Sequence, residues 1–406
     1  MADRELSQIR ELLREAYAAG LYQKAARIAR HCAELATERG EHFWRVQFRF
    51  WQGASLQSAG ENEAATTALM EAAQPEPQAD PADTYNAITT LIHIAIATKP
   101  AAFTRDLIRQ GRAFLERSGK GAWRHKLDLL EGHLAEQRGD WDAALAHQRR
   151  GYEAERQHPG YPGYTTATHL RHLVDSSFAG RDAEALARWR RALDDCDKET
   201  EGDHLYAERA RLRCHRAGLP DLGDPVTAAS GLLRQLDGYE GGDVVEFAID
   251  ALRVLLPRAA APAAEPQPAA VQHPRPDPSR PPATGPDPGP TAGEHPLIAD
   301  WLPRPGIGDD WLFGGDVHLA RARVALGLPP RDEDWCTRFE RPDPTRLTDP
   351  QRRRAQAHLA AARAHYEAQL DWAAAEDRRL ETSYRTDTLQ ARLQRTADLA
   401  PQQPSP

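Results

Sequence analysis

The sequence has few cysteines, few lysines and no long hydrophobic run. Its four cysteines, Cys32, Cys196, Cys214 and Cys336, are scattered through 406 residues and form no Cys-x-x-Cys pair. This spacing does not suit a disulfide scaffold, and free thiols suit a reducing cytosol, so we expect a cytoplasmic protein. No apolar stretch approaches the ~18 residues of a membrane span, and the first residues carry charge where a signal peptide would be apolar. We therefore expect no membrane partner.

Short motifs of catalysis and nucleotide binding are also absent. No GxxxxGK[ST], GxGxxG, GxSxG or HExxH stands in a usable context. The formal net charge of −8 disfavours non-specific binding to nucleic-acid phosphates. We expect a protein that is not an enzyme, binds no nucleic acid and needs no cofactor, although a catalytic site built from distant residues would leave no motif.

The sequence does contain a short motif that recurs at a fixed interval. Gly, an aromatic residue two positions later and Ala five positions later occur in Gly139-Asp-Trp141-Asp-Ala-Ala144, and the same pattern begins at Gly20. Gly60 and Gly180 begin versions without the aromatic, so these glycines are separated by 40, 79 and 41 residues. A turn at Lys99-Pro100 supplies the member expected near residue 99. A sustained period of about 40 residues predicts a repeat of two helices.

Small and aromatic residues predict how the two helices of a repeat pack. Small residues allow the two helices to approach each other closely: Gly53 and Gly132 in first helices, and Ala65 and Ala144 in second helices. Trp141, which follows the turn, is predicted to fill the gap that remains between the helices. An aromatic group early in the chain is also expected to be core: Phe43, Trp44, Phe48, Phe50 and Trp51.

These stretches resemble tetratricopeptide repeats. The second-helix pattern is seen in 139–154 and 180–195, and the family's order of small and large residues is followed by Gly53, Leu56, Gly60, Ala65, Leu69, Ala72 and Pro77. The resemblance covers residues 5–215 and implies an all-α, right-handed α-solenoid. Its period exceeds the ~34 residues of the standard repeat and is similar to that of bacterial signal-sensing regulators. Armadillo and HEAT repeats share the period, but the turn motif favours the tetratricopeptide type.

The composition divides the chain into four parts. Residues 1–257 form the predicted solenoid of about six helix pairs, 258–296 a Pro/Ala-rich linker, 297–400 a C-terminal helical unit with one tetratricopeptide-like pair, and 401–406 a disordered tail. A single pair cannot bury its own faces, so we expect the C-terminal unit either to dock on the end of the array near residues 243–256, which its tether favours, or to pair with another chain. Trp301, Trp311 and Phe313 are expected to pack back onto the solenoid.

The resemblance implies that the first helices line a concave binding face. Carrying the family's groove positions over identifies Arg10, Arg14, Tyr17, Gln47, Phe50, Ala54, Gln57, Lys126, Leu129, His133, Glu136, Leu170, Val174 and Ser177. This mixture of charges and apolar groups suits a protein or peptide partner. We interpret the chain as a non-catalytic scaffold or adaptor. The alternative is a sensor, responsive to a peptide or a small ligand, that acts through a partner protein.

Two groups of metal-ligand residue types have spacings that favour other roles. His169 and His172 stand one helical turn apart, with Asp175 a turn further, and we expect them on a solvated helix face. A second group fits no standard zinc spacing and consists of Cys196, His204, Cys214 and His215. We therefore expect no metal site.

Overall fold

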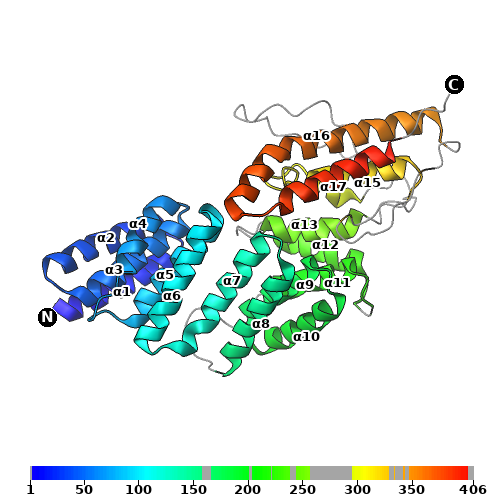
Figure 1. The fold of residues 1–406 in the computed structure, drawn as a ribbon. Coiled ribbons are helices and arrows are strands. Elements are labelled where there is room, and N and C mark those ends of the chain that lie inside the picture. Colours follow the sequence, from blue (N-terminus) through cyan, green and yellow to red (C-terminus); the bar gives the residue numbers. More distant parts are fainter. Residues whose placement is uncertain are drawn as a thin grey trace. The chain divides into compact units, whose positions relative to one another are not determined.

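The structure is a computed structural model that describes residues 2–157, 166–200, 204–220, 222–237, 244–256, 295–328, 333, 342 and 347–400. In these residues every regular element is a helix and no strand occurs (Figure 1). The chain divides into two compact units. Unit 1 comprises Met1–Ser176 with Arg379–Thr382, and unit 2 comprises Ser177–Arg378 with Ser383–Pro406. The all-α prediction is confirmed.

Unit 1 is a helical solenoid, a stack in which each first helix is followed by a second helix. The first helices are α1 (Ala2–Ala18), α3 (His42–Ser58), α5 (Pro81–Thr98), α7 (His125–Gln137) and, up to Ser176, α9 (Thr166–Ala179). The second helices are α2 (Tyr22–Glu38), α4 (Asn62–Ala72), α6 (Ala101–Ser118) and α8 (Trp141–Gln157). A short 3₁₀ helix, η1 (Gly121–Arg124), precedes α7.

The turns within the helix pairs lie where the repeating glycines predict them. Gly20, Gly60 and Gly139 adopt left-handed φ angles of 73°, 82° and 73°, which side chains disfavour. Pro100 begins the turn of the third pair, directly after the extended Lys99. At the turn that follows α9 the left-handed residue is Arg181, with φ of 58°, and not Gly180 as the motif suggests.

Two glycines of the first helices are required by the close approach of their second helices. A Cβ atom at Gly53 would lie 2.4 Å from Leu69 Cγ, and one at Gly132 would lie 2.5 Å from Gln148 Cγ. Both distances are shorter than any normal carbon–carbon contact. Because Leu69 and Gln148 are fully buried, neither side chain has free space to move into. The predicted close packing is confirmed.

The predictions for the aromatic residues are met in part. Trp44 and Phe48 are buried in one apolar cluster with Leu6 and Leu13, as expected. The remaining three pack at the edges of cores: Phe43, Phe50 and Trp51. Trp141 differs from its prediction, because it is only partly buried at the start of α8. The buried Gln148, two turns further along α8, packs against Gly132 instead.

The segment Arg379–Thr382 belongs to unit 1 although its neighbours in the sequence belong to unit 2. Leu380 is fully buried in the same apolar cluster as Ile92 and Leu130. Arg379 Nη1 donates to the carbonyl oxygens of Ile96 and Lys99, both at 2.8 Å. These contacts satisfy carbonyl groups that a helix end leaves without partners.

Unit 2 is also helical. Its elements are α10 (Ala183–Thr200), α11 (His204–Arg216), α12 (Pro225–Leu236), α13 (Val244–Leu255), α14 (Pro296–Trp301), α15 (Phe313–Ala325), α16 (Asp349–Leu380) up to Arg378, and α17 (Tyr384–Leu399). Trp301 and Phe313 are buried in one cluster with Phe247 and Leu252 of α13. These two aromatic residues therefore pack on α13, a helix within residues 1–257 of the predicted solenoid, as expected. Trp311 instead lies beside Trp372, with ring centroids 6.0 Å apart.

The predicted linker lies outside the described residues, apart from its last two, and so does the predicted tail 401–406. The domain boundaries at residues 257 and 297 remain predictions. Across the described helices, none has both the length and the apolar character that crossing a membrane requires.

Candidate binding surface on the first helices

The first helices of unit 1 lie close to one another. Helix α1 contacts α3, α3 contacts α5, and α5 contacts α7, whereas no contact of similar extent joins α2 to α4, α4 to α6 or α6 to α8 in the described part of the unit. A stack that is tighter on one side curves toward that side, so the first helices form its inner surface. We call this surface, formed by α1, α3, α5, α7 and α9 up to Ser176, the first-helix face.

Polar side chains on the first-helix face contact their counterparts about one repeat away. The hydrogen-bonded pairs are Tyr17 with Ser58 at 2.8 Å, Gln47 with Asp83 at 3.0 Å, Lys126 with Asn86 at 3.2 Å and Ser176 with Glu136 at 2.6 Å. Their members are 41, 36, 40 and 40 residues apart. The period of the sequence is therefore also the spatial period of these contacts.

Three histidines form a row across α5, α7 and α9. The ring centroids of His93 and His133 are 5.6 Å apart, and those of His133 and His172 are 5.7 Å apart. His93 is exposed, and His133 and His172 are partly exposed. We call these three residues the histidine row. A neutral imidazole carries one hydrogen-bond donor and one acceptor.

Glu136 lies one turn after His133 on α7 and connects the histidine row to the interior. Its Oε1 accepts hydrogen bonds from Gln148 Nε2 at 2.7 Å and from Ser176 Oγ at 2.6 Å, and its Oε2 lies 3.4 Å from His172 Nδ1. Burial alone would raise the pKa of Glu136, but His172, His133 and Ser176 outweigh burial and lower it to about 2. Glu136 is therefore a carboxylate at neutral pH, and its partners fix its position.

Burial also changes the protonation of the histidine row. It lowers the pKa of His133 to about 4, an effect that Glu136 opposes and that His172 and His93 reinforce. His93 is the most exposed of the three, but desolvation by the surrounding protein, with smaller contributions from His172 and Lys126, still lowers its pKa. His133 is therefore neutral at pH 7, and the lowered pKa of His93 favours its neutral form as well.

Two further groups of the first-helix face titrate close to neutrality. Burial lowers the pKa of Lys126 to about 7. Burial raises the pKa of Asp83 to about 6, although its hydrogen bond from Gln47 and the charges of Arg10 and Arg14 oppose the change. The charge of this surface therefore changes between pH 5 and pH 8 without any bound ligand.

The structure places the predicted binding residues in three ways. Arg14 is exposed, and seven others are partly exposed: Arg10, Tyr17, Phe50, Ala54, Gln57, His133 and Glu136. Gln47 and Lys126 are mostly buried, but each makes a hydrogen bond across the first-helix face. The last four have buried side chains, namely Leu129, Leu170, Val174 and Ser177. These four offer a partner almost no surface, because packing between neighbouring helices covers them.

Three residues of α5 belong to this surface but were not among the predicted ones. Asp83, Asn86 and His93 lie in the third repeat, whose turn has lost its glycine, so that its register was not assigned. One signal for them is present in the sequence. His93, His133 and His172 follow each other at intervals of 40 and 39 residues, which is the period of the repeat.

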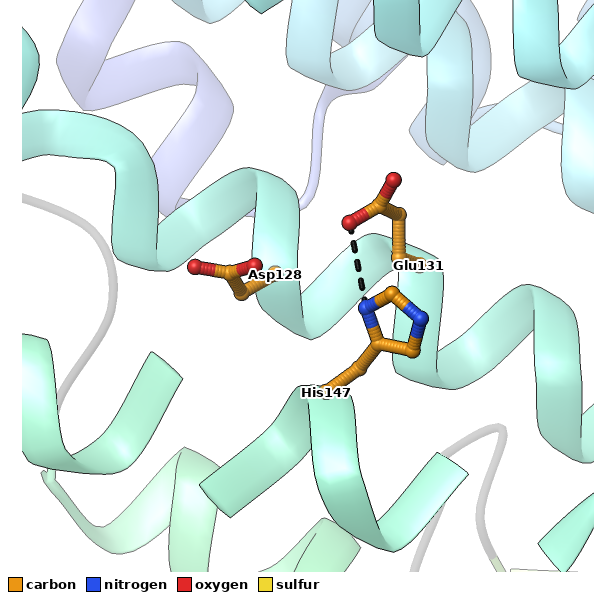
Figure 2. Close-up of side chains that lie close together, drawn as sticks. All are labelled: Asp128, Glu131 and His147. Atoms are coloured by element: carbon orange, nitrogen blue, oxygen red, sulfur yellow. Dashed lines mark ion pairs between the residues drawn. The ribbon is translucent and has the colours of Figure 1, made fainter. Parts of the chain in front are cut away.

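One cluster of metal-ligand side chains lies between α7 and the second helices. The ligand atoms of Asp128, Glu131 and His147 all lie within 4.8 Å of one another, and His147 Nδ1 is 3.1 Å from Glu131 Oε2 (Figure 2). Three arginines surround the two carboxylates. Arg112 forms an ion pair with Glu131, and nitrogens of Arg124 and Arg150 each lie 3.7 Å from an oxygen of Asp128. A divalent cation would meet three guanidinium charges here, so we interpret the cluster as a network of ion pairs.

The two predicted histidines of α9 do not share a site. His169 is fully buried, which contradicts the expected solvated position, and its Nε2 lies 3.5 Å from Glu155 Oε2. A glycine at position 151 makes this possible, because a Cβ atom there would lie 2.9 Å from His169 Cε1. His172 instead faces Glu136.

The second group of metal-ligand residue types considered in the sequence analysis is not brought together among the described side chains. Among these, three or more ligand atoms come together at Asp128, Glu131 and His147 only. Cys196, Cys214 and His215 form no such group, and the side chain of His204 lies outside those described.

Comparisons with known proteins leave the family of the chain open. No protein-family model matches the sequence, and no curated protein matches it. Among solved structures, the chain is similar to a "circular tandem repeat protein with novel repeat topology and enhanced subunit contact surfaces", with 13% sequence identity over 97% of this chain and 90% of that one. The TM-score of 0.18 means that the two backbones do not superpose, so nothing is inferred from this likeness.

Proposed function

We propose that unit 1 is a non-catalytic scaffold that binds a protein or peptide partner on its first-helix face. The observation that carries this proposal is the row of polar side chains that successive repeats supply at intervals of about 40 residues. A surface with regularly spaced donors and acceptors suits an extended ligand that crosses several helices. The third helix pair contributes Asn86 and His93, the fourth His133, and the fifth His172.

We also propose that the repeats are of the tetratricopeptide type. The glycine turns and the close approach of Gly53 and Gly132 to their second helices support this assignment. In such repeats the inner surface serves recognition, and the second helices provide the outer layer.

Selection of peptide ligands by the full chain tests the proposal. Peptides from a random display library are selected, and their affinity is measured for the wild type and for substituted chains. We expect Asn86→Ala and His133→Ala to weaken binding about tenfold, or ~1.4 kcal/mol, because both side chains face the ligand. The matched control is His31→Ala, since His31 is an exposed histidine on the second helix α2. Equal loss from the control and the two face variants would contradict the proposal.

A further inference from the structure

We propose that unit 1 binds one divalent transition-metal ion of the Zn²⁺ type between His125, Glu155 and His169. These residues come from the start of α7, the end of α8 and the start of α9. Their side chains are buried, so the site is distinct from the first-helix face and does not depend on the binding function proposed above. The expectation of no metal site treated His169 as solvated, and its burial removes that reason.

The three side chains are polar groups in the interior of the unit. His125 is 1% exposed, Glu155 7% and His169 0%. Within the described part of the chain, both ring nitrogens of His169 and Oε2 of Glu155 make no hydrogen bond. Buried polar atoms are almost always hydrogen-bonded, and an exception commonly marks a bound water or ion. The surroundings of His169 therefore call for a further partner.

The contact between Glu155 and His169 has the length expected for two ligands of one ion. Their Oε2 and Nε2 atoms are 3.5 Å apart, longer than the about 2.7–3.2 Å of a hydrogen bond. The contact is not an ion pair either, because burial, together with His125 and His172, lowers the pKa of His169 to about 3 and keeps the ring neutral at pH 7. Two ligands of a tetrahedral zinc ion, each ~2.1 Å from it, lie ~3.4 Å from each other.

His125 supplies the third ligand. Its ring centroid is 5.9 Å from that of His169, close to the ~5 Å that two imidazoles on one zinc ion require. The ligand atoms of the three residues do not lie within 4.8 Å of one another, so binding has to turn the His125 ring toward the other two. Gly151 of α8 allows the close approach, because a Cβ atom there would lie 3.0 Å from the His125 carbonyl oxygen and 2.9 Å from His169 Cε1. A water molecule would complete the tetrahedron.

The charges around the site permit a cation. Among the described residues, burial alone raises the pKa of Glu155 to about 7, and no arginine or lysine contributes to this shift. Residues 158–165, which follow α8, contain neither arginine nor lysine. The cluster in Figure 2 differs, because three arginines already compensate its carboxylates. Of the two groups, the one around Glu155 is therefore where an ion meets a carboxylate without competing guanidinium groups.

The ligand types select the class of ion. Two imidazoles and one carboxylate suit Zn²⁺ and related transition metals, whereas Mg²⁺ and Ca²⁺ prefer oxygen ligands alone. Metal ligands bind in their deprotonated forms, so the ion would hold Glu155 ionised. The raised pKa of Glu155 therefore belongs to the metal-free chain. Because the three ligands lie on three helices, the ion would also cross-link α7, α8 and α9.

Zinc titration of the full chain tests the site. The chain is prepared without a histidine tag, stripped with a chelator, and titrated with Zn²⁺ in competition with a chelating dye. We expect one tightly bound ion per chain, with Kd in the micromolar range or below, and a rise of about 5 °C or more in Tm at saturation. Co²⁺ in place of Zn²⁺ should give the visible absorption of a four-coordinate ion. Failure to bind zinc, or binding that leaves Tm unchanged, would overturn the inference.

Substitutions locate the ion. Glu155→Gln and His169→Gln should each weaken zinc binding at least tenfold, since each removes one ligand. His147→Gln is the matched control, because it alters the cluster in Figure 2 and should retain zinc. Circular dichroism monitors folding, and Glu155→Asp, which keeps the charge but withdraws the carboxylate, replaces any variant that does not fold and should also weaken binding. Wild-type affinity in the Glu155 variants, or loss of zinc in His147→Gln alone, contradicts the assignment and leaves the scaffold function standing.

Discussion

At the scale of single residues, the repeat depends on where side chains are small. Gly53 and Gly132 occupy equivalent places in two first helices, and Leu69 and Gln148 occupy the equivalent places opposite them. The sequence pattern predicts this close approach, because glycine and alanine recur at fixed positions. It does not predict that a buried glutamine replaces the leucine in the fourth repeat. Gln148 is needed there because it donates a hydrogen bond to Glu136.

Gly132→Ala should destabilise the protein. The new Cβ atom would lie 2.5 Å from Gln148 Cγ, and Gln148 is fully buried and bound to Glu136. We expect a loss of about 1–3 kcal/mol in the free energy of unfolding, measured with urea. The control is Gly231→Ala on α12, where no atom lies within 4 Å of the added Cβ, so that the better helix propensity of alanine should add up to ~1 kcal/mol. An unchanged or increased stability of Gly132→Ala would show that α7 and α8 are not in close contact.

Glu155 should make stability depend on pH in the opposite direction from Glu136. Burial raises the pKa of Glu155 from its usual 4.5 to about 7. Because this folded-state pKa lies above the unfolded value, the contribution to stability is complete below pH 4.5 and is lost as the pH rises through 7. Glu155→Gln keeps the shape without the charge. In the metal-free chain, the free energy of unfolding of Glu155→Gln minus that of the wild type should therefore be larger at pH 8.5 than at pH 4.5, by on the order of 1 kcal/mol.

Urea unfolding at the two pH values measures this difference. Glu153→Gln is the matched control, because Glu153 is an exposed residue of the same helix. If the stability difference between Glu155→Gln and the wild type is the same at both pH values, Glu155 does not titrate in a buried position.

At the scale of elements, local signals predict the helix pairs but not all of their contacts. Glycine turns and the Pro100 turn give the order and boundaries of the pairs, because a left-handed or extended residue ends a helix wherever it occurs. No local pattern indicates that Arg379–Thr382 belongs to unit 1. Its hydrogen-bond partners at Ile96 and Lys99 are 283 and 280 residues away in the sequence, and short-range patterns carry no information over such distances.

Leu380→Ala tests the role of this segment. Leu380 is fully buried in the apolar cluster of unit 1, so its truncation removes apolar contacts and leaves a cavity. We expect a loss of about 2–4 kcal/mol in the free energy of unfolding. Leu12→Ala should change stability by less than about 0.5 kcal/mol, since 58% of Leu12 is exposed. Equal effects of the two substitutions would mean that the segment is not anchored in the core of unit 1.

At the scale of the whole molecule, the sequence predicts a helical repeat protein and the helices that form its inner surface. It predicts the chemistry of that surface only in part. Leu129, Leu170 and Val174 occupy inner positions by register, yet helix packing buries them. The histidine row was missed in part because the third repeat lacks its glycine. The charge state of the row depends on burial, which no linear pattern contains.

The most direct test of the first-helix face as the binding surface is hydrogen–deuterium exchange of the full chain with and without a saturating selected peptide. Bound ligand slows the exchange of amide groups that it covers or orders. The account predicts that the peptide increases protection in α5, α7 and α9, and leaves exchange in α2, α4 and α6 unchanged. Protection confined to these second helices, with no change in α5, α7 and α9, would contradict it.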